Sequence, residues 1–374
     1  HPRIPEPLAY NAPQEPLLPK SAVEVISPAF AHAADQLAEP FRFAQWARIA
    51  LLALATGELS SGGGCNGITS LPTKVPHTSQ NFVEPGDVLR NIDPALIATL
   101  MMVLIFGGLV LWLVYIYVSS VTRFMLFEAV LQKNCGPLGE GWQRWQGPGL
   151  RYFWWQLALG FVGLAVAGVL FFPLLIPVIA VLKSHRQPGP ELLLAFIPMI
   201  AVLMIFGLVM HLIAVLAKDF VVPIMALDNV GVIEGWRRFF AILTPSISSY
   251  AGYIAMKIVL AIGAAVIFGV AAAIAAIFVI LPFGVVAFVV AIAAKGAGFS
   301  WNASTITAAI VALTIVLCVV VYAVALACVP IAVFFPAYAM YFLAERYPAL
   351  HARLYPAYPP PPSPPLAPAP VPIG

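Results

Sequence analysis

The sequence predicts an all-α fold: a polytopic bundle of transmembrane helices with about six net crossings and an internal parallel repeat of span, interfacial helix and span. Hydrophobic residues make up 61% of the 374 residues and charged residues only 9%, against about 25% charged in ordinary soluble domains. Apolar runs such as 95–118 and 192–217 carry no charge, and about 20 such residues in a helix cross the hydrocarbon core. These runs lack the period-two alternation that a membrane barrel requires, so we expect helices.

Two proline-rich ends flank the expected membrane domain, which covers residues 29–350. Residues 1–28 are polar and rich in proline, and we expect a flexible segment there. Residues 351–374 are dominated by proline and predict a disordered, extended polyproline tail. The tail is expected to be inert; the alternative is that its PxxP spacings bind the aromatic groove of a partner.

The first part of the membrane domain is expected to lie at the surface or to cross once. From Phe30 through Leu37 to Phe41, apolar residues recur at helical spacing, which is typical of an amphipathic surface helix. The next run, 43–60, is marginal as a span. An interfacial or re-entrant helix is the alternative for this run.

Five longer apolar tracts account for the other crossings. Pro173 and Pro177 lie in the second tract and are expected to kink it, because proline lacks the backbone N–H. The fourth tract is too long for one straight crossing and contains Leu-Pro-Phe-Gly at 281–284. We expect it to be broken there, as a span with a re-entrant half-helix or as two spans. The expected tracts are 94–120, 153–182, 191–217, 250–294 and 304–336.

The most informative pattern is an internal repeat. Residues 123–145 read RFMLFEAVLQKNCGPLGEGWQRW, and residues 219–240 read DFVVPIMALDNVGVIEGWRRFF. In each copy a span precedes the shared Glu-Gly-Trp motif and another span follows it. A weaker echo, residues 334–348, closes the last span. The copies run in parallel rather than inverted, which argues against a common class of secondary transporter.

The second copy has the pattern of an amphipathic helix at the membrane interface. Glu234 and Arg238 are four residues apart on its polar face, in the favourable order. Because tryptophan prefers headgroup depth, Trp142 and Trp236 of the two copies are expected to be interfacial anchors. The expected apolar face comprises Ile233, Trp236, Phe240 and Leu243.

Basic residues set the expected orientation. Segments 121–152 and 218–249 both carry several lysines and arginines, which are enriched in cytoplasmic loops. With 43–60 as a first outward crossing, both termini are then cytoplasmic. The expected location is the bacterial cytoplasmic (inner) membrane.

Few ionisable residues fall inside the apolar tracts, and such residues are candidates for function. His211, Asp219 and Lys257 are expected to border a polar crevice that opens to the cytoplasm. The competing interpretation is a buried, hydrogen-bonded histidine together with charges that anchor helix ends. In the first interpretation the phosphate of a lipid headgroup binds there on basic residues of the two motif segments, Arg144, Arg237 and Arg238.

No pattern of catalysis is found in the sequence. Zinc-protease, nucleophile-elbow, Walker A and dinucleotide-binding motifs are missing. We therefore expect no catalytic residues, no metal and no cofactor, and an enzyme is disfavoured. The formal net charge of +3 is small, which argues against a nucleic-acid partner.

The stretch DFVVPIMALDNVGVIEGWRRFFAIL, residues 219–243, resembles the membrane domain attached to some bacterial glycerophosphodiester phosphodiesterases. It is also similar to stand-alone, uncharacterised bacterial membrane proteins of that type, whose PFRFxxWxR…TGELSSGGG-like stretch corresponds to residues 40–64. The resemblance covers about residues 30–345. It implies a membrane module without the phosphodiesterase activity, because the catalytic barrel domain and its metal-binding carboxylates are not found in this sequence. No functional residues carry over.

The leading hypothesis is a non-enzymatic integral membrane protein, acting as a scaffold or a lipid-associated module. Its partners are then membrane lipids and, for a scaffold, a membrane or cytoplasmic protein. A second hypothesis is a transporter or permease-like protein for a lipid or amphipathic solute, which would use the kinked tracts. A third is an accessory subunit of a larger membrane complex that packs through small-residue faces such as 261–276.

Overall fold

The computed structural model describes residues 21–38, 41–58, 94–184, 190–296 and 303–355, without the side chains of 94, 96, 97, 100, 173–196, 295 and 303, and the statements below concern this part of the chain. Its regular structure is helical throughout, which confirms the all-α prediction. The helices are α1 (Ile26–Ala38), α2 (Phe43–Thr56), α5 (Pro94–Leu131), α6 (Leu138–Ser184), α7 (Pro190–Leu216), a π-helical turn (Ala217–Val221), α8 (Val222–Asp228), α9 (Val232–Leu243), a 3-10 turn (Thr244–Ser246), α10 (Ile247–Gly296), α11 (Ala303–Ala327), α12 (Val329–Ala344) and α13 (Pro348–Leu354).

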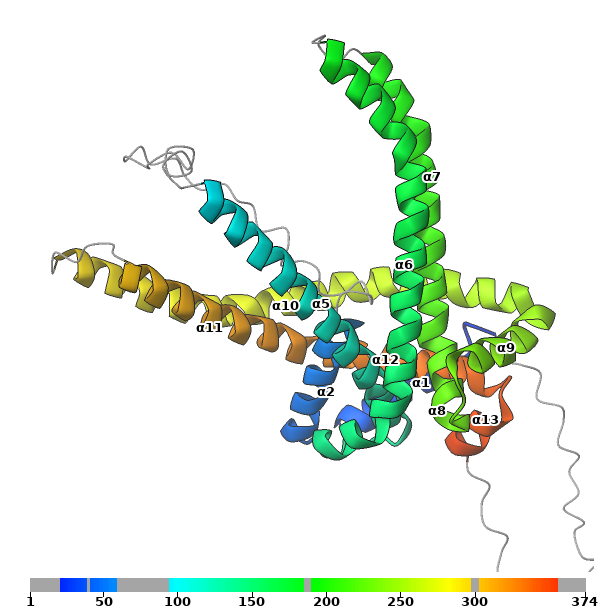
Figure 1. The fold of residues 1–374 in the computed structure, drawn as a ribbon. Coiled ribbons are helices and arrows are strands. Elements are labelled where there is room, and N and C mark those ends of the chain that lie inside the picture. The colour runs from blue at the N-terminus through cyan, green and yellow to red at the C-terminus, as the bar shows by residue number, and fades with distance from the viewer. Residues whose placement is uncertain (1–20, 39–40, 59–93, 185–189, 297–302, 356–374) are drawn as a thin grey trace, which may run out of the picture.

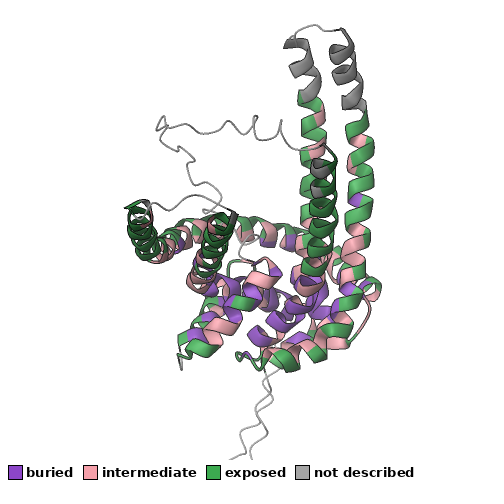
Figure 2. Cartoon of the chain, turned by 60° about the vertical axis from the view of Figure 1, so that its left-hand side comes forward, coloured by how far each residue is buried: buried purple, intermediate pink, exposed green. Residues whose placement is uncertain are grey.

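The longest helices project from a compact base as arms (Figure 1): α5 alone, α6 beside α7, and α10 beside α11. Five helical stretches are long and apolar enough to cross a membrane, so the chain is a membrane-embedded, multi-pass protein. The arm side chains are mostly exposed, as the green helices in Figure 2 show. We define the arms as residues 101–118, 153–172, 197–215, 258–294 and 304–319, and the base as the described residues of 21–58, 119–152, 216–257 and 320–355.

The base is built around α12. Most residues of α12 are buried, and α1, α2, α5 and α10 pack against it. An aromatic cluster lies beside this helix, where the Phe220 ring stacks on Phe239 with 5.2 Å between centroids. Tyr250, Tyr253 and Phe342 surround the stacked pair. Large aromatic side chains contribute strongly to a packed core, so this cluster holds together the helix ends that carry the charged site.

The tract expected to be one span at 304–336 contains a helix long and apolar enough to cross a membrane, α11, but continues as a second helix, α12, so the expected bound at 336 was wrong. α11 ends at Ala327, the backbone turns at Cys328 (φ −94°, ψ 2°), and Pro330 lies in the first turn of α12. Proline suits this position because its missing N–H has no helical partner there. The apolar composition of α12 predicted contact with lipid, but a helix that is apolar on all sides is equally suited to a protein core.

The tract 250–294 lies in one continuous helix, α10, so the expected break at 281–284 was also wrong. Pro282 lies inside the helix and removes one backbone hydrogen bond, to the Phe278 carbonyl, without ending the helix. With 50 residues, α10 is about 75 Å long, whereas the hydrocarbon core is about 30 Å thick. Its first turns belong to the base, where Tyr250 and Tyr253 are buried.

The segment expected to be flexible, 1–28, is folded in its described part, from Ser21 onward. Ser21 and Glu24 form a reciprocal capping box in which each backbone N–H donates to the other's side-chain oxygen, at 3.0 and 3.4 Å. α1 follows and buries Leu37, as expected, whereas Phe30 is 68% exposed.

α2, the helix of the marginal run 43–60, is short. It has 14 residues and a length of about 21 Å, less than the thickness of the hydrocarbon core. Its inner face packs against α5 and α12 in the base. The expected total of about six crossings depends on this helix and stays a prediction.

Candidate functional site

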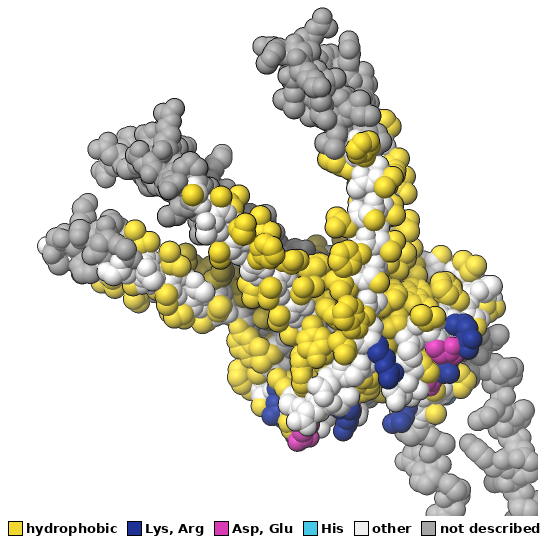
Figure 3. All heavy atoms as spheres, in the orientation of Figure 1, with side chains coloured by type: hydrophobic (Ala, Val, Ile, Leu, Met, Phe, Trp, Pro, Cys, Tyr) yellow, Lys and Arg dark blue, Asp and Glu magenta, His cyan; other side chains and the backbone are white. Residues whose placement is uncertain are grey.

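The base and the arms differ in their content of charged side chains. The described arm residues contain no Asp, Glu, Lys or Arg. Figure 3 shows basic and acidic side chains on the side of the base away from the arms, and hydrophobic side chains along the arms. A second group of charges is buried where the arms join the base. We call it the buried charge cluster, and it comprises Glu58, Arg123, Lys218, Asp219 and Lys257.

Two ion pairs form the core of the buried charge cluster. Lys218 Nζ lies 2.6 Å from Glu58 Oε2, and Lys257 Nζ binds Asp219 Oδ2. Tyr253 donates its hydroxyl hydrogen to the same Asp219 oxygen at 3.0 Å. The four charged side chains are 4–13% exposed. Buried pairs of this kind add little stability over apolar packing, so ionisable groups held at this depth are candidates for function.

A π-helical turn places two of these charges next to each other. It covers Ala217–Val221, and the Val222 N–H bonds to the Ala217 carbonyl, five residues back. The widened turn carries Lys218, which pairs with Glu58 just past the end of α2, and Asp219, which pairs with Lys257 on α10. Single π-turns inside α-helices are frequently found at functional sites, which supports this segment as part of a site.

Arg123 is the third cation of the buried charge cluster, and it forms no ion pair with the described residues. Its Nη2 donates to the Thr56 carbonyl at 3.5 Å, and its Nη1 to the Tyr152 hydroxyl at 3.4 Å. Its Nε is buried without an acceptor in the described part of the chain. The cluster therefore holds three cations against two carboxylates, and its guanidinium group has donor capacity to spare.

Two cavities adjoin the cluster and share Arg123 and Lys218 as wall residues. The smaller, of about 40 Å³, is lined by Glu58, Asp219 and apolar residues of α5, α8 and α12. The larger, of about 310 Å³, lies between α2, α5, α6 and α7. Its lining comprises Thr56, Gly57, Tyr115, Ile116, Ser119, Arg123, Gln156, His211, Ala214, Val215 and Lys218.

The structure brings together some of the residues expected at a polar crevice. Asp219 and Lys257 form an ion pair, and His211 lines the larger cavity. Arg144, Arg237 and Arg238 line neither of these two cavities. Among the described residues, no three His, Cys, Asp or Glu side chains gather as a metal site would require.

Glu58, Arg123 and Lys218 were missed as site residues. Lys218 and Arg123 stand at the ends of apolar tracts and resembled anchoring charges. Glu58 lies 160 positions from its partner in the chain, and no local pattern predicts a pairing over that distance. The usable signal was a pair of adjacent opposite charges, Lys218 and Asp219, at the end of a long apolar tract.

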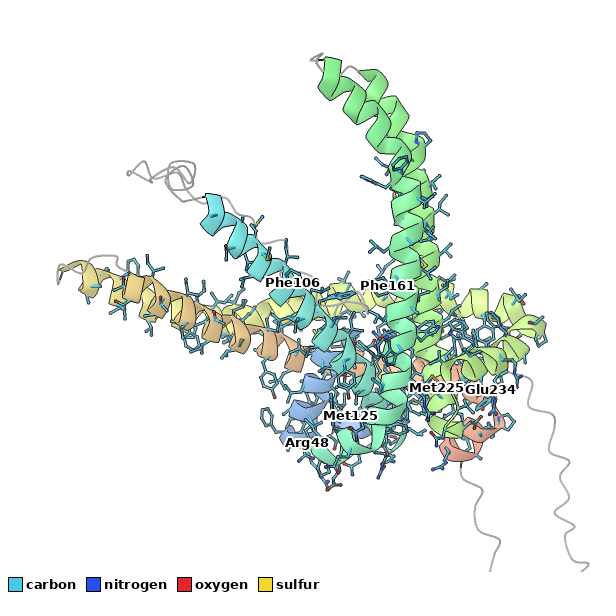
Figure 4. The ribbon with its side chains drawn as sticks, in the orientation of Figure 1. Arg48, Phe106, Met125, Phe161, Met225 and Glu234 are labelled. Carbon is cyan, nitrogen blue, oxygen red and sulfur yellow. The ribbon has the colours of Figure 1, made fainter. Side chains whose placement is uncertain are left out.

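The two Glu-Gly-Trp segments pack on the base through their glycines. A Cβ atom at Gly141 would lie 2.9 Å from Met125 Cε, and one at Gly235 would lie 3.2 Å from Met225 Cγ. Figure 4 labels both methionines in the base. Glycine therefore permits a close approach of each segment to the helix before it.

The arginine that follows each of these glycines is paired with a carboxylate. Arg144 binds Glu128 near the end of α5, and Arg238 binds Asp228 at the end of α8. Arg237 lies 2.7 Å from Glu234 and is 79% exposed. Exposed pairs contribute at most about 1 kcal/mol, so these arginines can exchange their partners for an external anion.

Trp142 and Trp236, the expected anchors, are half-buried. The Trp142 ring packs edge-on against Tyr117, and the Trp236 ring packs against Trp155 with 5.9 Å between centroids. In α9 the buried face is Val232, Gly235 and Phe239. Two residues of the expected apolar face, Ile233 and Phe240, lie off this buried face and are 85% and 51% exposed.

A separate polar contact attaches α1 to the base. His32 is 3% exposed, with Nε2 2.8 Å from the Val130 carbonyl and Nδ1 3.2 Å from the Tyr341 hydroxyl. Gln36 donates to the neighbouring Ala129 carbonyl at 2.9 Å. Burial lowers the pKa of the His32 imidazole below its ordinary value. Burial likewise raises the pKa of the Cys135 thiol, in the turn after α5, to about 11, so neither group carries charge near neutral pH.

Comparison with known proteins adds one finding. A model of a protein family described as "Family of unknown function (DUF7544)" matches residues 20–353. No curated protein and no solved structure matches the chain.

Proposed function

The chain belongs to DUF7544, a family of unknown function, and from its structure we propose that it is a non-enzymatic, lipid-associated module of the bacterial cytoplasmic membrane. In this proposal the arms lie in the hydrocarbon core. The base lies at the cytoplasmic surface with both termini, where its basic side chains meet anionic headgroups. The resemblance to membrane domains of glycerophosphodiester phosphodiesterases implies a membrane module and no phosphodiesterase activity.

The separation of charge from apolar surface carries this proposal. The described arm residues have no Asp, Glu, Lys or Arg, whereas the base has more basic than acidic side chains. Arm side chains such as Val169 and Leu164 are 73% and 70% exposed, which is stable in lipid and unfavourable in water. The excess of basic residues matches the negative cytoplasmic surface of bacterial membranes.

α9 supports the position of the base at the interface. Its exposed strip combines apolar Ile233 and Phe240 with the 79% exposed Arg237. A helix with an apolar strip next to basic residues is suited to the boundary between acyl chains and headgroups. The opposite face of α9 is fixed to the base through Gly235 and Phe239, so the strip faces outward in a defined direction.

We further propose that the repeated segments are two copies of one headgroup-facing unit. Gly141 and Gly235 hold the same place in the two motifs, and both approach a methionine of the preceding helix. Arg144 and Arg238 follow at the same spacing, and both pair with an acid at the end of that helix. This shared geometry supports the internal repeat as a structural unit.

The test is to purify the full chain from bacterial membranes in mild detergent and to measure co-purified lipids by native mass spectrometry. We expect anionic lipids, such as phosphatidylglycerol, to be enriched over zwitterionic ones relative to the bulk membrane. Replacing Arg144, Arg237 and Arg238 together by Gln is expected to reduce the enrichment. Lipids in bulk proportions in the unchanged protein would refute the proposal, and a stoichiometric protein partner instead would favour an accessory subunit.

A transporter for an amphipathic solute is the second candidate, and the buried Asp219–Lys257 pair favours it. Charged groups within membrane tracts often mark solute or proton pathways. In a transporter, Lys257→Ala or His211→Ala abolishes uptake while the protein stays folded in detergent. Retained uptake in both variants would count against this candidate.

A further inference from the structure

We infer that the larger cavity, at the junction of α2, α5, α6 and α7, is a binding site for a phosphate group, as carried by the headgroup of an anionic lipid. This inference rests on the proposed lipid association and names an interior site for it. The site is distinct from the exposed arginines of the two motif segments, since none of these lines the cavity.

The charge balance of the cavity wall favours an anion. Lys218 is paired with Glu58, and Lys257 with Asp219, which leaves the Arg123 charge without a carboxylate among the described residues. A partly buried cation without a carboxylate partner is costly. A bound monoanion would bring the five-residue cluster to neutrality, and a phosphodiester carries one negative charge.

The donors of Arg123 also suit a phosphate. Two of its N–H groups make long contacts of 3.4 and 3.5 Å to neutral oxygens, and its Nε is buried without an acceptor in the described structure. Guanidinium groups bind phosphate oxygens through two parallel hydrogen bonds, which are shorter and stronger than bonds between neutral groups. A phosphate against Arg123 therefore replaces weak contacts by strong ones.

Polar groups around the cavity complete a headgroup site. His211, Gln156 and Ser119 line it together with Arg123 and Lys218. The Ser119 hydroxyl donates to the Thr56 carbonyl at 3.2 Å, and Gln156 accepts a hydrogen bond from Ser120 at 2.7 Å. The cavity volume of about 310 Å³ is at the lower end of the range for small-molecule sites, about 300–1,000 Å³. The smaller cavity, of about 40 Å³, has room only for water.

The position of the cavity points to a lipid as the carrier of the phosphate. Tyr115 and Ala214 in its wall are exposed residues of the arms α5 and α7. Beyond them, Leu111 on α5 and Leu208 on α7 are 72% and 67% exposed. Acyl chains lie favourably along these uncharged helices while the phosphate occupies the cavity. A soluble phosphate compound without acyl chains makes no favourable contact with this apolar surface.

The test is to titrate delipidated full-length protein with phosphatidylglycerol in mixed micelles and, in a second arm, with inorganic phosphate, following binding by native mass spectrometry. Arg123→Gln removes the unpaired cation. Ala214→Phe fills the cavity without removing any charge, which keeps the test valid if the first variant folds poorly. Arg353→Gln is the matched control, because Arg353 is an exposed base arginine that does not line the cavity.

We expect phosphatidylglycerol affinity to fall about tenfold or more in Arg123→Gln, as for the loss of one charge-assisted hydrogen bond. A similar fall is expected in Ala214→Phe, because its ring occupies the volume of the headgroup, and no change is expected in Arg353→Gln. Inorganic phosphate binding with the same dependence on Arg123 would also support the phosphate site and identify a soluble source. Phosphatidylglycerol binding that both cavity variants leave intact would overturn the inference alone. No phosphatidylglycerol binding by the unchanged protein would refute the proposed function as well.

Discussion

The base and the arms use similar apolar residues for opposite purposes. Phe220 in the base is fully buried and stacked on Phe239, whereas Phe106 and Phe161, labelled on the arms in Figure 4, are 62% and 64% exposed. The base carries charged residues, several of them in ion pairs, whereas the described arm residues include no Asp, Glu, Lys or Arg. Protein covers the apolar residues of the base, whereas the apolar residues of the arms are exposed on helices long enough to cross a membrane.

Side-chain truncation gives the largest expected contrast between the two regions. Phe220→Ala is expected to lower the free energy of unfolding by about 3–5 kcal/mol, because it opens a cavity in a packed aromatic core. Phe106→Ala on α5 is expected to change it by less than about 0.5 kcal/mol, as for an exposed site. Denaturant unfolding in detergent measures both, and equal losses would contradict the division into base and arms.

Removal of one buried charge is expected to have the next largest effect. Asp219→Ala leaves Lys257 buried without its carboxylate, and we expect a loss of about 3 kcal/mol in the free energy of unfolding. The double variant with Lys257→Met is expected to recover most of this loss, because no unpaired charge remains. A double variant as unstable as the single one would show that the pair itself stabilises the base.

Two glycines of α6 offer a finer comparison within one helix. A Cβ at Gly149, in the base, would lie 2.8 Å from the Val121 backbone, whereas Gly160, in the arm, has nothing within 4 Å. Gly149→Ala is therefore expected to destabilise by about 1–3 kcal/mol, and Gly160→Ala to stabilise by about 0.5–1 kcal/mol. Thermal unfolding of the two variants measures whether each substitution lowers or raises stability. If Gly149→Ala left stability unchanged, α6 would have to lie farther from α5 than in this structure.

Acidification is expected to have the smallest effect, confined to α1. His32 has a pKa lowered from 6.5 by burial, so its contribution to stability is complete above about pH 6.5 and is lost as pH falls through the folded pKa. Neighbouring Asp35 stays charged in this window, because the Lys133 ion pair lowers its pKa further. Hydrogen exchange of α1, corrected for intrinsic rates, should be faster at pH 5.5 than at pH 7.5, and His32→Gln should remove the difference.

The helical, multi-pass character was predictable, because a long uncharged run in lipid must satisfy its backbone hydrogen bonds internally, which a helix does. Asp219 and Lys257 were predictable as site candidates because charges stand out within apolar tracts. The burial of α12 was not, since an apolar helix has the same composition in lipid and in a protein core. The continuity of α10 across Pro282 was not, because proline weakens a helix without always ending it.

The site itself was only partly predictable, for a reason of distance along the chain. Glu58 meets Lys218 through packing of α2 against the helices of the base, and no periodicity encodes that contact. In the sequence, Arg123 resembles an interfacial anchor. Its lack of a carboxylate partner among the described residues is a feature of the folded structure. Charge pairing across 160 positions is a property of the fold, and local patterns do not contain it.

The central claim is that the arms lie in the bilayer and the base lies at its cytoplasmic face. Single cysteines at Leu164 and Val169 on α6, and at Arg353 in the base, can be labelled with a membrane-impermeant maleimide in a variant that lacks the natural cysteines. We expect rapid labelling at position 353 in inside-out vesicles only, and labelling of the arm positions only after solubilisation and denaturation. Labelling of the arm positions in intact vesicles as fast as at position 353 would contradict the account.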